Sequence, residues 1–460
     1  GSFENRVRFL LEIIAGIRAG CGLDFPISVR INVEEALPGG IDHDQAQKIA
    51  QAAETAGADA IDVSCFTAGC IEPGSYQQGW KRYMARLIKD VVSIPVIAVA
   101  NVKEPQVAED LLRAGDCDFV GVARAHLADP LWSLKSRTGH ETEICPCIGC
   151  LACFGEIAKP LRIKCAVNPL CGREQEFSVL DRNGDGRTVA VIGGGPAGIQ
   201  AALVLAERGF TPVLFEEQDE LGGALTIAEK GRHKELISTY IDYLRDQVHK
   251  AGITVHLGSA PSVAEIEALE PCGVFIACGA QPWRPPIPGA TDSHVHTAED
   301  VLLGRAEPTG QVAVIGTGMT GLEAAEILIE RGCKITLVEM LNDLGPGMLP
   351  MVVNDVMGRV NLGKPRILTG HRLEAIADDT IRLTRLADES TETVPADYVV
   401  LAAGVRPRSD VAERYRSLPN LRIIGDAARS GRILEATQDG YAKASVFEPL
   451  TDHNSQRSEA

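Results

Sequence analysis

The segment TVAVIGGGPAGIQAALVLAERG (residues 188–209) decides the fold of a large part of this chain. Its apolar beginning predicts a β-strand, its G-x-G-x-x-G pattern (Gly193, Gly195 and Gly198) predicts a tight turn, and its remainder predicts an α-helix. Glycines in this order let the backbone approach a pyrophosphate, and the unpaired N–H groups of the helix amino terminus favour an anion. The segment therefore predicts a dinucleotide-binding β-α-β unit, in preference to glycines that serve packing alone.

Two later segments support this prediction. The strand VLFE (213–216) ends in Glu216, an acid placed to bind a ribose hydroxyl, and LGG (221–223) follows it. Farther along, Gly425 and Asp426 come directly after a strand. Asp426 either accepts hydrogen bonds from a flavin ribityl chain or caps the helix that follows.

A second segment, QVAVIGTGMTGLEAAEILIERG (311–332), repeats the pattern with Gly316, Gly318 and Gly321. The similarity of the two segments predicts an internal duplication. The strand after the second helix ends at Glu339, where a carboxylate hydrogen-bonds a 2′-hydroxyl and repels a 2′-phosphate. We therefore expect NADH to be favoured over NADPH. The alternative is that Glu339 is only a solvated strand end.

Four cysteines have the spacing C-x2-C-x2-C-x11-C: Cys147, Cys150, Cys153 and Cys165. A [4Fe–4S] cluster needs four thiolates, and a compact C-x2-C-x2-C run is typical of such clusters. Structural zinc fits less well, because zinc sites usually pair their ligands two and two across a longer spacer. Buried free thiols are the other alternative. Cys145 and Cys171 flank the run outside this spacing, and we expect neither to be a ligand.

Residues 1–130 alternate short apolar strands with amphipathic helices, which predicts right-handed β-α-β units and a parallel sheet of four strands. The strands are expected at 25–32, 59–64, 94–100 and 118–123, and the helices at 42–57, 80–92 and 104–115.

The bulk properties exclude several classes of function. The 460 residues carry a net charge of −17, which argues against nucleic acid as a partner because phosphate binding needs a basic surface. No apolar run approaches the roughly 18–20 residues that span a bilayer, and the amino-terminal residues GSFENRVRF lack the apolar stretch of a signal peptide, so we expect neither a membrane span nor a secretory leader. The 13 cysteines, four in one short run and the others scattered, are typical of a cytoplasmic protein with a metal or cluster site.

The order of half-barrel, cysteine run, GGGPAG (193–198) and GTGMTGLE (316–323) resembles the 2,4-dienoyl-CoA reductase and trimethylamine dehydrogenase family over nearly the whole chain. That family joins an old-yellow-enzyme-like FMN barrel to an iron–sulfur cluster and a disulfide-reductase-like module. The resemblance implies an α/β protein with the carboxy-terminal half of a (β/α)8 flavin barrel, a small cluster segment and two Rossmann-like domains. The implied division is a partial barrel (1–140), the cluster segment and linker (141–187), an FAD domain (188–295 and 400–446), an NAD(P)H domain (296–399) and a tail (447–460).

The resemblance also implies roles for individual residues. Arg30 matches a barrel arginine beside the flavin N1–O2 edge, although a salt bridge at the barrel end is the alternative. The residues implied to hold the FMN phosphate follow the last two barrel strands and are Ala100, Asn101, Ala123 and Arg124; the family often has glycine at the first three of these. The expected FAD contacts are Gly193, Gly195, Pro196, Ala197, Gly198, Glu216, Gly223, Gly279, Gly425 and Asp426. The expected NAD contacts are Gly316, Gly318, Gly321, Glu323 and Glu339.

The implied function is electron transfer from NADH through FAD and the [4Fe–4S] cluster to FMN. In an intact parent protein, FMN then reduces an α,β-unsaturated carboxylate or thioester. A family member carries four more barrel strands before Gly1, with a proton-donating tyrosine, so we expect this chain to be a fragment that acts as a diaphorase. The catalytic acid is unassigned, and nothing specifies Tyr76 or Tyr83 for that role. An amine dehydrogenase, an electron-transfer subunit and a non-catalytic nucleotide-binding remnant are the alternatives, and the substrate and oligomeric state stay open.

Overall fold

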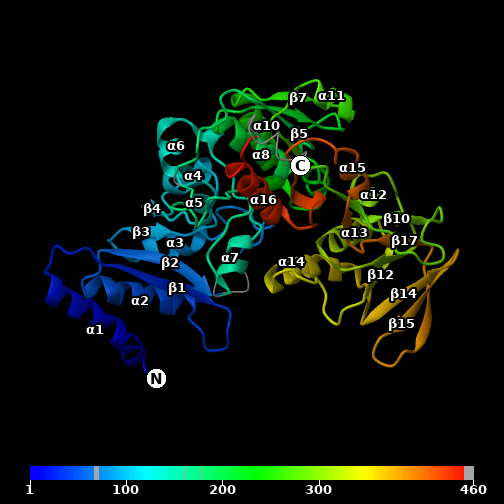
Figure 1. Ribbon diagram of the computed structural model, residues 1–460. Coiled ribbons are helices and arrows are strands. Elements are labelled where there is room, and N and C mark those ends of the chain that lie inside the picture. Colours follow the sequence, from blue (N-terminus) through cyan, green and yellow to red (C-terminus); the bar gives the residue numbers. More distant parts are fainter. Residues whose placement is uncertain (67–71, 160, 178, 450–460) are drawn as a thin grey trace. The chain divides into compact units, whose positions relative to one another are not determined.

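The computed structural model describes residues 1–66, 72–159, 161–177 and 179–449 (Figure 1). The chain divides into two compact units, Gly1–Gly149 and Cys150–Ala460. Within the described ranges, no helix combines the length and the apolar character that crossing a bilayer requires.

The first unit is a four-stranded parallel sheet whose strands alternate with helices, as the sequence predicts. The strands, in spatial order, are β1 (Ser28–Glu35), β2 (Ala60–Phe66), β3 (Val96–Ala98) and β4 (Phe119–Val120). The helices are α1 (Phe3–Cys21), α2 (His43–Thr55), α3 (Arg82–Lys89), α4 (Pro105–Arg113), α5 (Arg124–Ala128), α6 (Trp132–Thr138) and the 3-10 helix η1 (Glu141–Glu143). Ala46, Ala50 and Ala53 form the buried face of α2, at the spacing of an amphipathic helix.

The bounds of all four strands differ from the predicted ones: β2 runs from Ala60 to Phe66 instead of 59–64, and β3 from Val96 to Ala98 instead of 94–100. The differences at the first and last strands have local reasons. The first begins at Ser28 instead of residue 25, because Pro26 has no N–H for the ladder, and it continues to Glu35. The last contains only Phe119 and Val120. The chain leaves the sheet at Gly121, where an added Cβ would lie 2.9 Å from the Val99 side chain.

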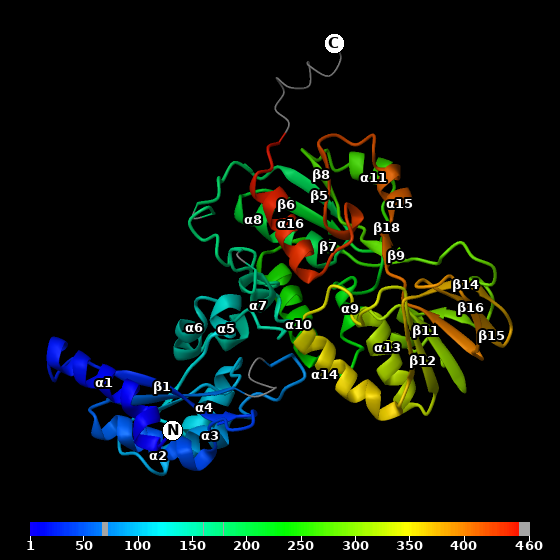
Figure 2. The same ribbon diagram turned by 90° about the horizontal axis from the view of Figure 1, so that it is seen from below.

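The second unit begins with a five-stranded parallel sheet in the order β19-β8-β5-β6-β7. Its strands are β5 (Thr188–Ile192), β6 (Thr211–Phe215), β7 (Thr254–His256), β8 (Val274–Ile276) and β19 (Leu421–Ile423). The surrounding helices are α7 (Ala152–Ile157), α8 (Pro196–Glu207), α9 (Leu225–Ala228), α10 (Glu235–Lys250), α11 (Val263–Glu267), α15 (Ser409–Arg414), α16 (Ile433–Ser445) and the 3-10 helix η3 (Gly425–Ala427). Helix α16 lies against α8 (Figure 2), and a Cβ at Gly440 would lie 2.3 Å from the Ala197 carbonyl oxygen, so only glycine permits this approach.

A second five-stranded parallel sheet follows in the order β10-β17-β11-β12-β13. Its strands are β10 (Val295–Thr297), β11 (Gln311–Ile315), β12 (Lys334–Glu339), β13 (Arg366–Thr369) and β17 (Tyr398–Leu401). Its helices are α12 (Ala298–Leu302), α13 (Met319–Glu330), α14 (Pro350–Val360) and the 3-10 helix η2 (Asn361–Gly363). An antiparallel sheet of β14 (His371–Ile376), β15 (Thr380–Arg385) and β16 (Thr391–Pro395) lies beside it, and β9 (Ala280–Pro282) pairs with β18 (Val405–Pro407).

The two parallel sheets have the same plan. In each, the strand before the glycine turn lies between the strand after the helix and a later strand, so β8-β5-β6 corresponds to β17-β11-β12. This arrangement is the one that the predicted duplication requires, and it places both glycine turns at the carboxyl ends of central strands, where α/β folds bind their ligands.

Candidate functional site

The first glycine turn connects β5 to α8. Gly193 has a φ of +113°, and an added Cβ would lie 2.2 Å from the Ala277 carbonyl oxygen; at Gly198 it would lie 2.0 Å from the Gly193 carbonyl oxygen. Gly195 differs, because its added Cβ would meet nothing nearer than Gly223 Cα at 3.8 Å. Packing therefore explains Gly193 and Gly198 but not Gly195, which adjoins space that a pyrophosphate can occupy.

The amino terminus of α8 lies next to Gly195. Pro196 is its first residue, Ala197 follows, and no side chain caps its open N–H groups. This cradle fits the phosphates of a dinucleotide, since N–H groups and the helix dipole both favour negative charge.

The LGG segment folds onto this turn. The Gly222 N–H donates to the Gly194 carbonyl at 2.9 Å, and a Cβ at Gly223, whose φ is +53°, would lie 2.8 Å from Gly195 Cα. Arg245 of α10 holds the segment by donating to the Leu221 carbonyl oxygen at 3.0 and 2.6 Å. The sequence gives no indication of this role for Arg245, because its polar environment resembles that of any exposed helical arginine.

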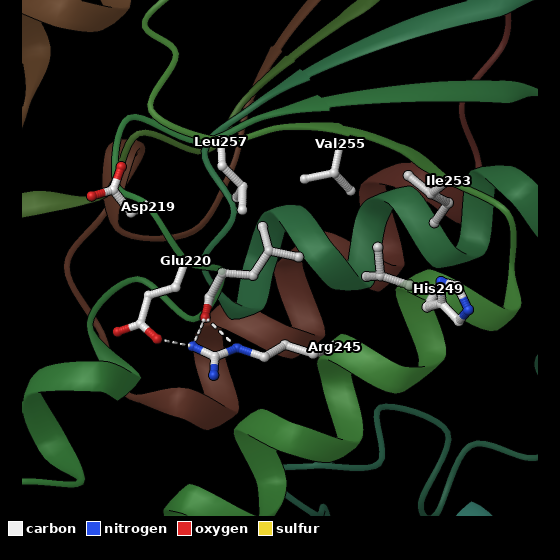
Figure 3. Close-up of a pocket in the computed structure, with 9 residues that line it drawn as sticks. Asp219, Glu220, Arg245, His249, Ile253, Val255 and Leu257 are labelled. Carbon is white, nitrogen blue, oxygen red and sulfur yellow. Dashed lines mark hydrogen bonds and ion pairs between the residues drawn. The ribbon is translucent and has the colours of Figure 1, made fainter.

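Arg245 also borders an open hollow of about 450 Å³ between α10 and the end of β7. Figure 3 shows its guanidinium pointing toward the Glu220 carboxylate, to which it donates at 2.6 Å. Leu221 of the LGG segment lines this hollow, and no residue of either glycine turn does.

Glu216 is 5% exposed at the end of β6 and binds the turn itself. Its Oε2 accepts from the Gly194 N–H at 2.7 Å and its Oε1 from the Gln218 N–H at 2.9 Å. The carboxylate is thus fixed beside the cradle, while its predicted contact with a ribose stays a prediction.

Gly425 and Asp426 lie in η3, and Gly279 adjoins open space with a φ of +73°. Asp426 accepts from the Gly431 N–H at 2.9 Å, and the cap position of α16 is Arg432. The alternative that Asp426 caps this helix is therefore wrong. Burial and the nearby Glu435 raise the pKa of Asp426, against the hydrogen bond from Gly431 that lowers it.

The second glycine turn, between β11 and α13, repeats the first. Gly316 has a φ of +98° and its added Cβ would lie 2.4 Å from the Ala402 carbonyl oxygen; at Gly321 it would lie 2.1 Å from the Gly316 carbonyl oxygen. At Gly318 an added Cβ would meet no atom within 4 Å. The second unit therefore contains two cradles of matching geometry, each open at its middle glycine.

Glu339 is 6% exposed, so the alternative that it is a solvated strand end is wrong. Its Oε2 accepts from both the N–H of Thr317 at 2.9 Å and the Thr317 hydroxyl at 2.8 Å, and its Oε1 accepts from the Leu341 N–H at 3.0 Å. The carboxylate is held beside the second cradle, and its discrimination between nucleotides stays a prediction.

Glu323 is 5% exposed on α13 and pairs with Lys234 Nζ at 2.5 Å. Burial raises the pKa of the Glu323 carboxyl, and Lys234 opposes this shift. Lys234 immediately precedes α10, so the pair joins an element of the first nucleotide sheet to an element of the second. The sequence does not predict that Lys234 pairs with Glu323, because the two residues are 89 positions apart (323 − 234).

In the first unit, Arg30 of β1 lies opposite Asp62 of β2. It donates to Asp62 Oδ2 at 2.9 Å and to Ser64 Oγ at 3.2 Å. The salt bridge named as an alternative is thus present, and a role for Arg30 beside a flavin stays a prediction.

The loops after β3 and β4 meet at Arg124. Arg124 donates to Asn101 Oδ1 at 2.6 Å, and to the carbonyl oxygen and Oε2 of Glu72 at 2.6 and 2.8 Å. Asn101 is 7% exposed with a φ of +58°, Ala100 is fully buried, and Ala123 directly precedes α5. The structure therefore brings together the loops predicted to hold the FMN phosphate.

The cysteine run lies on the division between the units, with Cys147 in the first and Cys150, Cys153 and Cys165 in the second. Four thiolates suit a [4Fe–4S] cluster by their chemistry. In the part of the chain that the structure describes, no three His, Cys, Asp or Glu side chains are grouped as a metal site requires. The cluster accordingly stays a prediction.

Comparison with known proteins decides the family. A family model described as pyridine nucleotide-disulphide oxidoreductase matches residues 187–419, and one described as NADH:flavin oxidoreductase / NADH oxidase family matches residues 1–143. The chain is 37% identical to an NADH oxidase of Thermoanaerobacter brockii, over 96% of this chain and 70% of that protein. The chain belongs to the NADH:flavin oxidoreductase / NADH oxidase family. The resemblance drawn from the motifs is confirmed.

Further members of this family are similar over the same span. A cinnamate reductase of Clostridium sporogenes is 30% identical, over 96% of this chain and 70% of that protein. The solved structure of a 2-naphthoyl-CoA reductase in complex with 2-naphthoyl-CoA has a TM-score of 0.92 and 27% identity, over 97% of this chain and 69% of that one. As a member of the family, the protein is a flavin-dependent NADH oxidoreductase in which a partial flavin-barrel region is joined to Rossmann-like domains.

Proposed function

We propose that the protein oxidises NADH at FAD and passes the electrons through a [4Fe–4S] cluster to FMN, and that in the intact parent protein FMN reduces an α,β-unsaturated carboxylate or thioester. The observation that carries the proposal is the pair of matching cradles in one compact unit, each open at its middle glycine (Gly195 and Gly318). An enzyme that moves electrons from one dinucleotide to another needs two such sites.

The first cradle is the proposed FAD site, within a domain of residues 188–295 and 400–446. When bound, FAD accepts a hydride and releases its electrons singly, which is the chemistry that a two-electron donor and a one-electron carrier require. The chain's own part is to hold the pyrophosphate at Gly195 and the N–H groups of α8, with Glu216 fixing the turn. Gly425 and Asp426 come to this domain from the far end of the chain through β19, which pairs with β8.

The second cradle, in a domain of residues 296–399, is the proposed NADH site. Glu339 is buried and held by three hydrogen bonds, so its negative charge has little freedom to move away from a bound nucleotide. A 2′-phosphate brought close to that charge is repelled, whereas a 2′-hydroxyl can donate to it. This supports NADH over NADPH.

Residues 1–140, which lie within the first unit, are the proposed FMN domain. Arg124 and Asn101 supply donors for the phosphate from two adjacent loops, and Arg30 supplies a cation for the pyrimidine edge of the ring. The Tyr83 hydroxyl donates to Glu34 at 2.9 Å, and burial and this hydrogen bond raise the pKa of Tyr83 to about 12. Its proton is engaged by a carboxylate of the same unit, and the catalytic acid stays unassigned.

The proposed cluster has Cys147, Cys150, Cys153 and Cys165 as ligands, in the segment 141–187 that joins the two units. The proposed substrate class rests on the relatives whose names give a cinnamate and a naphthoyl thioester as substrates. Both compounds carry unsaturation conjugated to a carbonyl group, so a developing negative charge is delocalised onto oxygen when hydride adds.

Turnover under anaerobic conditions tests the proposal. This chain, loaded with FAD, FMN, iron and sulfide, should oxidise NADH with ferricyanide as the acceptor. The intact parent protein, loaded in the same way, should also oxidise NADH when cinnamate is added, and dihydrocinnamate should appear in equal amount to the NADH consumed. Dihydrocinnamate added in place of cinnamate is the matched control and should give no oxidation. NADH oxidation by ferricyanide without turnover of any unsaturated carbonyl compound in the intact parent protein would remove the substrate class while leaving the nucleotide sites in place.

A further inference from the structure

A group of buried charges in the first unit lies beside the proposed phosphate loops. Lys103 is 5% exposed, Lys81 is 7% exposed and Glu72 is 5% exposed, and Arg124 completes the group. We call Lys81, Lys103 and Arg124 the cation cluster. None of the predicted site residues except Arg124 belongs to it.

Glu72 serves two of the three cations. It forms an ion pair with Lys81 through Oε1, and with Arg124 through Oε2 at 2.8 Å. Lys103 is different, because its ammonium donates to the amide oxygen of Asn101 at 2.8 Å and pairs with no carboxylate among the described residues. Glu72 therefore pairs with two of the three cations, whereas the Lys103 ammonium and the Arg124 guanidinium meet at an uncharged oxygen, that of the Asn101 amide.

A buried ammonium that has no carboxylate partner is costly unless an anion compensates it. The cost is visible at Lys103, whose pKa is lowered to about 8 by burial and then by Arg124, against the opposing influence of Cys147, Glu72 and Glu104. A phosphate monoester carries a charge of roughly −1.5 to −2 at neutral pH, which suits a site where two cations meet.

The geometry of Lys103 is that of a prepared binding group. Its ammonium and the Arg124 guanidinium both donate to the same atom, Asn101 Oδ1, at 2.8 and 2.6 Å, so an oxygen close to this atom is within reach of both. The Lys103 backbone is fixed on both sides, since its N–H donates to Gln78 Oε1 at 2.7 Å and its carbonyl accepts from Trp132 Nε1 at 2.8 Å. Little conformational entropy remains to be lost when a ligand binds.

We propose that Lys103, supported by Lys81, binds the phosphate of FMN together with Arg124, and so makes this site select a phosphorylated flavin over an unphosphorylated one. The inference rests on the proposed FMN site and adds the residues that recognise the phosphate. Glu72 stays as the counterion that keeps Lys81 and Arg124 in place.

Calorimetric titration of the full chain with FMN and with riboflavin, which lacks the phosphate, tests the proposal. The chain should bind FMN at least tenfold more tightly than riboflavin, and Lys103→Gln should weaken FMN binding by about 10- to 100-fold with riboflavin binding unchanged, since a hydrogen bond to a charged group is lost. Lys103→Arg should restore part of the loss. Lys89→Gln is the matched control, because Lys89 pairs with Asp118 on the surface and should leave both affinities unchanged. Unchanged FMN binding in Lys103→Gln, or an equal loss for both flavins, overturns the proposal.

A measurement of Tm with inorganic phosphate tests the role of Lys103 independently of the proposed function. If the chain binds neither flavin, the FMN site fails, and phosphate alone then decides the role of the cluster. Phosphate should raise the Tm of the chain and of Lys89→Gln, and raise that of Lys103→Gln by less than half as much. An equal rise in all three proteins overturns the role of Lys103 whether or not FMN binds.

Discussion

Glu339 holds Thr317 by two hydrogen bonds to one oxygen, from its N–H at 2.9 Å and from its hydroxyl at 2.8 Å. In the first cradle Glu216 accepts a single hydrogen bond from the Gly194 N–H, at 2.7 Å, and the two residues of each pair are 22 positions apart. In each case an acid at the end of one strand fixes the turn that follows the neighbouring strand. The two acids thus stabilise their turns before any nucleotide binds, and a substitution at either one changes both the turn and the charge beside it.

Replacing Glu339 should relax the preference for NADH. Glu339→Gln keeps an oxygen that can accept from Thr317 but removes the charge that repels a 2′-phosphate, a repulsion of about 1–3 kcal/mol. We expect the ratio of kcat/KM for NADH over NADPH to be tenfold or more in the unaltered chain and to fall by roughly tenfold in the variant. Glu374→Gln, at a half-buried position of β14 where the carboxylate pairs with Arg372, is the control. Equal values for the two nucleotides in the unaltered chain would refute this role.

Substitutions at the two middle glycines should affect the two nucleotide sites one at a time. An added side chain at Gly195 or Gly318 meets open space, so Gly195→Val and Gly318→Val should both fold but fill the place of a pyrophosphate. We expect Gly195→Val to lose FAD and Gly318→Val to keep FAD while its KM for NADH rises, so that each variant is the control for the other. Flavin content after gel filtration and steady-state kinetics measure the two effects, and full retention of FAD in Gly195→Val would contradict the assignment.

Breaking the Lys234–Glu323 pair should destabilise the second unit in a pH-dependent way. Lys234→Met leaves the buried Glu323 carboxylate without its cation, which we expect to cost about 2 kcal/mol near pH 8, less than for a fully buried pair because Lys234 is partly exposed. Burial already raises the pKa of Glu323 in the folded state, and losing Lys234 raises it further. The folded state then binds more protons than the unfolded state, so stability falls as the pH rises above the unfolded pKa.

Urea unfolding at pH 5.5 and 8 measures this difference. The gap between Lys234→Met and the unaltered chain should be larger at pH 8, and Lys234→Met/Glu323→Gln should recover most of the loss. A gap that does not depend on pH would mean that Lys234 acts by packing alone.

The iron and sulfide content of cysteine variants should distinguish the proposed cluster ligands from the flanking cysteines. Cys165→Ser should lose most of the iron and sulfide, because serine replaces a thiolate ligand poorly, while Cys171→Ser should keep them. Anaerobic iron and sulfide analysis checks both variants. Four irons retained in Cys165→Ser and lost in Cys171→Ser would exchange the two assignments.

The sequence predicts the parts of the fold that are fixed locally. Four glycines predict the two turns because only glycine fits there: backbone atoms of nearby residues, or of the residue that follows an adjacent strand, exclude a side chain. They are Gly193, Gly198, Gly316 and Gly321. The ends of strands are less predictable from runs of apolar residues. The first strand begins after Pro26, which has no N–H for the ladder, and the last strand ends before Gly121.

The remaining site residues depend on tertiary contacts. Lys103 follows an apolar strand like any loop lysine, and only the fold brings it beside Arg124. Arg245 and Lys234 likewise take their partners from distant segments. The burial of Glu339 is also a property of the folded chain, and it rules out the interpretation of Glu339 as a solvated strand end.

Rapid mixing of NADH with the anaerobic protein, loaded with FAD, FMN, iron and sulfide, tests the central claim of electron flow between two nucleotide sites most directly. Flavin absorbance and the paramagnetic signal of the cluster are followed together, in the unaltered chain and in Gly318→Val. We expect flavin absorbance to fall first and the cluster signal to rise afterwards, and both rates at low NADH to fall by at least tenfold in Gly318→Val. Equal rates in the two proteins, or a cluster signal that rises before any flavin is reduced, would contradict it.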